Sequence, residues 1–106
     1  MLSFINKKFT RGEIMEESVP TIFVGKKPFM NYVTGVVLQF NSGAKKVLIK
    51  ARGKYISRAV DVAEVTRNKF LKDVKLESIK IGSEEFDSPE GRKIRVSTIE
   101  IALSKP

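Results

Sequence analysis

The chain has 106 residues, with 20 Lys or Arg against 12 Asp or Glu, and carries a formal net charge of +8. This length is that of a single domain, and the hydrophobic fraction of 42% is enough for a core and too high for a disordered chain. The sequence has neither Cys nor His, which excludes disulfides, Cys/His zinc sites, thiolate nucleophiles and catalytic groups that use imidazole.

The apolar residues are too dispersed to span a membrane. No apolar run exceeds three residues, and the N-terminus lacks the basic and apolar regions of a secretory signal. We therefore expect a cytoplasmic protein with no membrane partner.

The beginning of the chain divides into an extension and a first strand. Residues 1–18 are polar and lack regular periodicity, which predicts a flexible N-terminal extension, and residues 19–106 are then one domain. A short strand is expected over residues 21–24, where we predict burial, and Gly25 ends it.

Two helices and a second strand follow in alternation. Pro28 suits the first turn of a helix, and apolar residues at i, i+3, i+4 and i+7 spacing continue through residues 29–40. Gly43 is placed to cap the end of this helix, and alternating side chains predict a strand over residues 46–52. The second helix is predicted over residues 55–70, with one apolar stripe along it. The members of that stripe are Ile56, Ala59, Val60, Ala63 and Phe70.

The C-terminal third changes to the two-residue periodicity of strands. Residues 74–81 and 94–103 alternate apolar and polar side chains around the turn-forming residues 87–91, which predicts a hairpin. Both runs shift parity once, at residues 76–79 and 96–99, so we expect a matched bulge or strong twist there. The predicted fold is an α/β (α+β) two-layer sandwich in the order β-α-β-α-β-β. It has a four-stranded mixed sheet, two helices on one face and a projecting C-terminal hairpin.

The excess positive charge lies between residues 18 and 60. The segments before and after it are each balanced, whereas this segment has eight basic residues and no acidic one. The pattern is typical of a protein that binds a polyanion, although a one-signed solubilising surface remains an alternative. The eight residues are Lys26, Lys27, Lys45, Lys46, Lys50, Arg52, Lys54 and Arg58.

Many of these basic residues fall in turns between a strand and a helix. Lys26 and Lys27 precede the first helix, where free N–H groups and the helix dipole favour an anion. Neighbouring parallel strands end on the same side of a sheet, so we expect both basic turns to form one binding surface. The second turn and the helix after it carry Lys50, Arg52, Lys54 and Arg58.

The predicted hairpin carries charges of both signs. Arg92 and Arg95 could reach into the minor groove of a duplex. Acidic residues near the tip could suggest a metal or general-acid site, but clustered acids at a turn are usually only solvated. These residues are Glu84, Glu85, Asp87 and Glu90. We therefore expect no metal, no cofactor and no enzymatic activity.

Seven short segments carry a resemblance to a known family. They are Ile22–Pro28, Met30–Val33, Ile49–Gly53, Ile56–Ser57, Ala59–Asp61, Arg67–Asn68 and Arg95–Ile101. In this order they resemble archaeal Alba, a family of basic chromatin proteins that also bind RNA, over residues 19–105. The resemblance implies a homodimer that coats double-stranded DNA without strong sequence preference and is associated with the archaeal nucleoid. A protein that acts mainly on RNA, as a chaperone or ribonucleoprotein subunit, is the first alternative.

The resemblance also implies roles for the basic residues. Lys26 and Lys27 would lie at the centre of the binding surface, and Lys26 matches an acetylation site, which implies an acetyltransferase and a deacetylase as partners. The hairpins would carry Arg92 and Arg95 into the minor groove, although the stiff, acidic turn at residues 88–90 departs from the family pattern. Flanking the lysines would be Arg52, Lys54 and Arg58.

The end of the second helix has two readings. On the residues alone, Phe70 is either a core residue or an exposed anchor for self-association. The resemblance matches Phe70, with Arg67 and Asn68, to the patch through which dimers contact one another along DNA. Two functions of other classes remain as alternatives: a metal-dependent nuclease that uses the hairpin acids, and an adaptor whose basic face binds an acidic protein.

Overall fold

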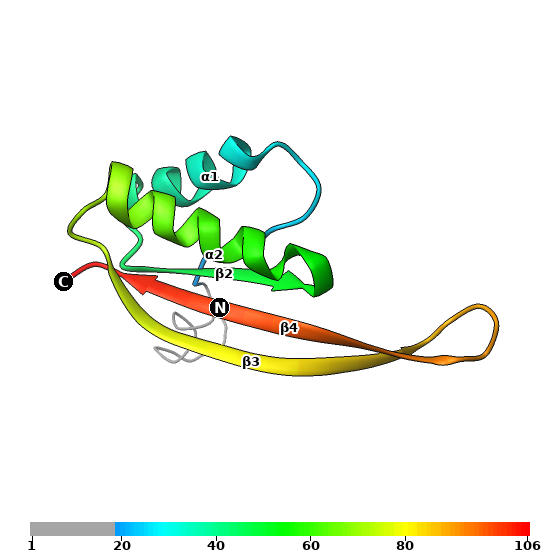
Figure 1. The fold of residues 1–106 in the computed structure, drawn as a ribbon. Helices are drawn as coiled ribbons and strands as arrows, with labels where there is room; N and C mark the ends of the chain where they lie inside the picture. The colour runs from blue at the N-terminus through cyan, green and yellow to red at the C-terminus, as the bar shows by residue number, and fades with distance from the viewer. Residues whose placement is uncertain (1–18) are drawn as a thin grey trace, which may run out of the picture.

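Four strands pair into one mixed sheet in the computed structural model, which describes residues 19–106 (Figure 1). The strand order is β1-β2-β4-β3; β1 and β2 are parallel, and the other neighbouring pairs are antiparallel. The predicted element order and mixed sheet are confirmed, whereas the extension predicted over residues 1–18 lies outside the described residues. The strands are β1 (Thr21–Phe23), β2 (Lys46–Arg52), β3 (Lys75–Asp87) and β4 (Lys93–Ser104).

Both helices lie on the same face of the sheet (Figure 1). α1 (Phe29–Asn41) is followed by Gly43, whose φ of 109° is a conformation that suits glycine. α2 (Ile56–Val65) lies between a 3-10 turn, η2 (Gly53–Tyr55), and a π-helical turn, η3 (Thr66–Phe70). The α-helix itself is thus shorter than predicted. The two turns at its ends supply the rest of the predicted helical segment.

The π-helical turn corrects the stripe predicted for the second helix. The N–H of Leu71 donates to the carbonyl of Thr66 at 2.8 Å, five residues back, so the helical phase shifts after α2. Phe70 is therefore 50% exposed and does not continue the buried stripe. Val60 is exposed for a different reason, because it lies within α2 beside the buried stripe of Ala59, Val62 and Ala63. Thr66 and Val62 are buried in their place.

The core fills the space between the two helices and strands β2 and β4. Along β2, Val47, Ile49 and Ala51 are buried toward the helices, and the residues between them point to the opposite face. Each large apolar side chain buried in this way stabilises the fold by roughly 1.5–3 kcal/mol. The largest fully buried apolar side chains are Phe40, Ile49, Ile101, Leu103, Val33, Val36, Val47 and Val62.

The first strand is less buried than predicted. Ile22 packs against the core, and Val24, just after the strand, is buried. Phe23 is 70% exposed, because neighbouring residues of a strand point to opposite faces and β1 is an edge strand. The prediction of a wholly buried strand is therefore wrong at this position.

β3 and β4 form a long hairpin that extends past the helices (Figure 1). The bulge predicted on the first of these strands is confirmed, since the pairing shifts between Leu76 and Ser78. The matching shift predicted on the second strand is wrong, because the pairing of β4 stays in register there. Ile94 and Val96 simply lie on the face opposite to Ile99, because the distal hairpin extends beyond the core that Ile99 helps to fill.

Candidate nucleic-acid interface

The two basic turns lie together at one end of the sheet. Residues 25–28, which we call the lysine turn, follow β1, whereas η2 follows β2, and these strands run parallel. The N–H of Val24 donates to the carbonyl of Lys50 at 2.8 Å, and Gly25 and Arg52 line one cavity of about 650 Å³. The structure therefore shows the convergence expected from the parallel strand order.

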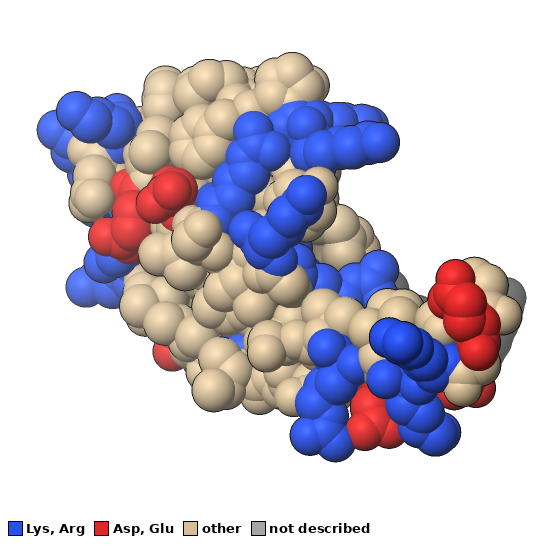
Figure 2. Space-filling view, turned by 45° about the vertical axis from the view of Figure 1, so that its right-hand side comes forward, with Lys and Arg blue, Asp and Glu red and all other residues tan. Residues whose placement is uncertain are grey.

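Three lysines at this end are available for an anion. Lys26 and Lys27 in the lysine turn and Lys54 in η2 are exposed, and within residues 19–106 none of them forms an ion pair. The ammonium of Lys54 lies 5.5 Å from the ring centroid of Tyr55. Figure 2 shows one group of basic side chains on the body with no acidic side chain among them. Together with the N-terminus of α1, these lysines can bind the phosphates of a polyanion.

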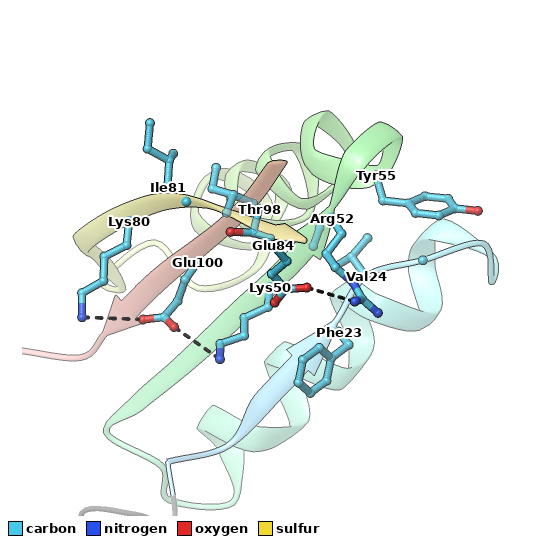
Figure 3. Close-up of a pocket in the computed structure, with 14 residues that line it drawn as sticks. Phe23, Val24, Lys50, Arg52, Tyr55, Lys80, Ile81, Glu84, Thr98 and Glu100 are labelled. Atoms are coloured by element: carbon cyan, nitrogen blue, oxygen red, sulfur yellow. Dashed lines mark hydrogen bonds and ion pairs between the residues drawn. The ribbon is translucent and has the colours of Figure 1, made fainter. Parts of the chain in front are cut away.

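Lys50 and Arg52 differ from these lysines because both are already paired. On the face of β2 away from the helices, the ammonium of Lys50 lies 3.4 Å from Glu100, and Nη1 of Arg52 donates to Oε1 of Glu84 at 3.0 Å (Figure 3). Lys80 approaches Glu100 as well, at 4.0 Å. Exposed pairs of this kind contribute about 0–1 kcal/mol, so a phosphate can displace the carboxylate from Arg52.

Replacing Glu84 with Gln is expected to raise the affinity for duplex DNA about 3- to 10-fold, because the change releases one arginine for phosphate and removes one repulsive charge. Fluorescence anisotropy with a labelled duplex measures this effect. Glu90→Gln is the matched control, since it removes the same charge from the hairpin turn. An equal gain in the control would show that the overall charge, and not the release of Arg52, sets the affinity.

The row of ion pairs on this face continues to the bulge. Oε2 of Glu77, the residue at the bulge, lies 2.8 Å from the ammonium of Lys46. The hydrogen bond from Lys46 lowers the pKa of the Glu77 carboxyl. A lowered folded-state pKa means that the pair stabilises the fold above the unfolded-state pKa, and this contribution is lost as the pH falls through the folded-state value. Lys46 is thus engaged within the fold.

Arg58 is also used inside the molecule. Its Nη1 donates to the carbonyl of Gly25 at 2.6 Å, and its guanidinium carbon lies 5.8 Å from the ring centroid of Tyr32. The hydroxyl of Tyr32 accepts hydrogen bonds from the N–H groups of Gly25, at 3.0 Å, and Lys27, at 2.9 Å. Arg58 therefore lies beside the lysine turn as predicted for a flanking residue, but one of its donors supports the turn itself.

The hairpin is not a purely basic arm. Nη2 of Arg95 donates to Glu85 at 2.7 Å, and the ammonium of Lys93 lies 3.8 Å from Asp87. The described residues contain no ion pair for Arg92, whose backbone closes the turn. Figure 2 shows acidic side chains beside the basic ones here. The three basic residues after the turn face four acidic residues before and within it, so the distal hairpin has a small net negative charge.

The residues implied in contacts between dimers lie together in η3. Phe70 is half-exposed and Asn68 is exposed, so both are accessible. Nη1 of Arg67 donates to Glu64 at 2.6 Å, three residues earlier, while its Nε is buried and has no hydrogen-bond partner. Of the two readings of Phe70, the exposed one fits this placement better than the core one.

Some functional features were not found from the sequence. The role of the Tyr32 hydroxyl is not apparent from the sequence, because the residue fits the apolar stripe of α1. The carboxylates that pair with the basic residues are not apparent either, because they are distant along the chain. A third feature is a row of apolar side chains on β3, on the helix face of the sheet and exposed to 40–83%: Leu76, Ile79 and Ile81. The alternation of apolar and polar residues predicts a strand here, but it does not show that the helices leave these apolar side chains uncovered.

Neither a metal cluster nor a membrane-spanning helix is found in the part of the chain that the structure describes. Within residues 19–106, no group of three or more acidic or other ligating side chains is arranged to hold a metal ion. In the same part of the chain, no helix is both long and apolar enough to cross a membrane.

Comparison with known proteins gives one consistent match. The Alba family model matches residues 20–83. The chain is 61% identical over 85 residues to the DNA/RNA-binding protein Alba of Methanocella arvoryzae, covering 80% of this chain and 88% of that protein. It is 58% identical over 90 residues to the DNA/RNA-binding protein Alba of Thermoplasma acidophilum, covering 85% of this chain and 98% of that protein. The solved structure of Alba from Thermoplasma volcanium superposes with a TM-score of 0.76 at 58% identity, covering 80% of this chain and 99% of that one. The chain therefore belongs to the Alba family.

Proposed function

We propose that this protein binds double-stranded DNA without sequence preference, coating and compacting the chromosome, and that it also binds RNA. The observation that carries the proposal is the lysine turn, where Lys26 and Lys27 lie exposed beside Lys54 and the N-terminus of α1. Lysines contact phosphates and carry little information about base sequence. The relatives are named DNA/RNA-binding proteins, which supports the same ligands.

The binding unit is a homodimer. Ile79 and Ile81 on β3 are 53% and 83% exposed, although they pair in register with the buried Ile101 and Ile99 on the same face. An apolar row that continues the core outward is typical of a surface that a second copy covers. Two chains of +8 would then present +16 to the polyanion.

Several further roles follow from this proposal. From the family resemblance we infer that Lys26 is an acetylation site, served by an acetyltransferase and a deacetylase; the residue is exposed, and acetylation would remove its charge. Arg67, Asn68 and Phe70 join dimers along DNA, and Arg92 and Arg95 reach the minor groove. The domain of residues 19–106 is sufficient for binding, and the protein is associated with the chromosome in the cytoplasm.

The main alternative is a protein that acts chiefly on RNA, since the relatives are named for binding both nucleic acids. Anisotropy titrations with two unrelated duplexes and one structured RNA, at matched salt, separate the two functions. If a dimer makes about 6–10 phosphate contacts, affinity is expected to fall roughly 10³- to 10⁵-fold between 50 and 200 mM salt, with little difference between the duplexes. Salt-independent binding, or none at 50 mM salt, would contradict the proposal, and much tighter RNA binding would favour the alternative.

We propose a binding function and no enzymatic one. The same labelled DNA and RNA, incubated with the protein and Mg²⁺, should remain intact, because three of the four carboxylates near the hairpin tip are engaged with basic side chains. Glu84, Glu85 and Asp87 would be the first suspects if cleavage occurred. Cleavage that the Glu84→Gln variant abolished would replace this function with that of a nuclease.

A further inference from the structure

The lysine turn is fixed by side chains from two helices. Its central residues are exposed and would by themselves sample many backbone conformations, at a cost in entropy when a ligand orders them. The backbone–backbone hydrogen bonds nearest to it, from Val24 to Lys50 and from Asn31 to Pro28, lie at its two ends. Within the described residues, the interior of the turn is held by side chains instead.

The first support is Tyr32, one turn into α1. Its side chain belongs to the core and the residue is only 8% exposed, so the ring cannot move freely. Its hydroxyl oxygen accepts one N–H from Gly25 at 3.0 Å and another from Lys27 at 2.9 Å. These donors belong to Gly25 and Lys27, so one hydroxyl oxygen fixes the backbone on both sides of Lys26.

The second support is Arg58, which extends from α2. Its Nη1 donates to the carbonyl of Gly25 at 2.6 Å, so side chains hold both the N–H and the carbonyl of that residue. The guanidinium group also lies 5.8 Å from the ring centroid of Tyr32, within the range of a cation–π contact. Side chains from the two helices thus meet at the lysine turn.

We propose that Tyr32 and Arg58 are positioning residues, which hold the lysine turn in the backbone conformation that presents Lys26 and Lys27 to neighbouring phosphates. The inference rests on the proposed function of the turn. A role for charge alone does not require these supports, whereas the proposal predicts that removal of the uncharged Tyr32 hydroxyl weakens nucleic-acid binding. A pre-ordered site loses less entropy on binding, and that difference appears as affinity.

The direct test is Tyr32→Phe, which keeps the ring and every charge. We expect the duplex affinity to fall about 5- to 20-fold, and amide hydrogen exchange to accelerate at Gly25 and Lys27. Ser42→Ala, which removes a hydroxyl at the opposite end of α1, is the control and should bind as the parent does. A parent-like affinity for Tyr32→Phe would overturn the proposal.

A double-mutant cycle separates positioning from a general effect on the fold. In a Lys26→Ala, Lys27→Ala background there are no ammonium groups to position, so Tyr32→Phe should cause no further loss. An equal loss in both backgrounds would overturn the proposal. If the lysine variant alone bound like the parent, the proposed interface itself would be wrong; if it bound weakly while Tyr32→Phe did not, only the positioning role would fail.

Arg58→Lys provides an independent test that does not depend on the core. The substitution keeps the positive charge but replaces the planar guanidinium group, which donates to the carbonyl of Gly25 and lies over the ring of Tyr32 at 5.8 Å from its centroid. We expect a loss of affinity comparable to that of Tyr32→Phe. A parent-like affinity would show that Arg58 acts only through its charge and would contradict its positioning role.

Discussion

Lys26→Glu combined with Lys27→Glu is expected to weaken duplex binding by at least about 100-fold near 100 mM salt. In the proposed dimer, the variant reverses four charges at the centre of the proposed interface. The slope of log affinity against log salt should fall by about 3–4, because each lost phosphate contact reduces it by nearly one. Thermal unfolding should change little, since both side chains are exposed and the described residues show no ion pair for either.

The control for this variant carries the same change in net charge elsewhere. Lys45 and Lys75 lie at the opposite end of the sheet, where β2 and β3 begin. Lys45→Glu with Lys75→Glu should lower the affinity only modestly, through the weaker field of a less positive protein. If both double variants lost affinity equally, binding would depend on total charge, and the lysine turn would not be its centre.

Ile79→Glu combined with Ile81→Glu is expected to convert a dimer into a folded monomer. Both side chains are largely exposed on β3, so the charges cost little within one chain, but they would be buried against a second copy. Light scattering coupled to size exclusion should show the molar mass fall by about half, and the salt slope should fall in the same proportion because each particle then carries one interface.

Leu38→Glu is the matched control for the dimer. Leu38 is another exposed apolar residue, but it lies on α1 and outside the β3 row. This variant should keep the mass and the affinity of the parent. A double variant on β3 that remained dimeric would place the contact between subunits elsewhere on the molecule.

The fold could be predicted wherever a single core sets the pattern. β2 alternates against the helices along its whole length, and its bounds match those expected from the sequence. Prediction of which side chains are buried failed where packing shifts the helical phase or changes the face of the sheet on which apolar residues lie. The π-helical hydrogen bond of Leu71 turns Phe70 out of the core, and the distal hairpin leaves the core so that Ile94 changes face. Neither effect is encoded in local periodicity.

The site could be predicted in part for the same physical reasons. The position of Lys26 and Lys27 in a turn can be predicted, because the strand, the glycine and the helix start around them are all local signals in the sequence. The partners of the arginines are not local: Glu84 is 32 residues away from Arg52 in the sequence and meets it only when the hairpin folds back. The role of the Tyr32 hydroxyl could not be predicted for another reason: the ring fits the apolar pattern of the helix, while the oxygen accepts hydrogen bonds from the lysine turn.

The ion pairs of the hairpin affect how the salt dependence of binding relates to the number of phosphate contacts. When a phosphate takes Arg95 from Glu85, the duplex releases a condensed cation, but the freed carboxylate attracts a cation in return. The same exchange applies wherever an arginine leaves a carboxylate, including Arg52 and Glu84. Such contacts can fix the geometry of the complex while adding almost nothing to the number of ions released. If the hairpin binds a duplex as proposed, the salt slope of this protein reports chiefly on cations that have no carboxylate partner, such as Lys26 and Lys27, and much less on paired arginines such as Arg95.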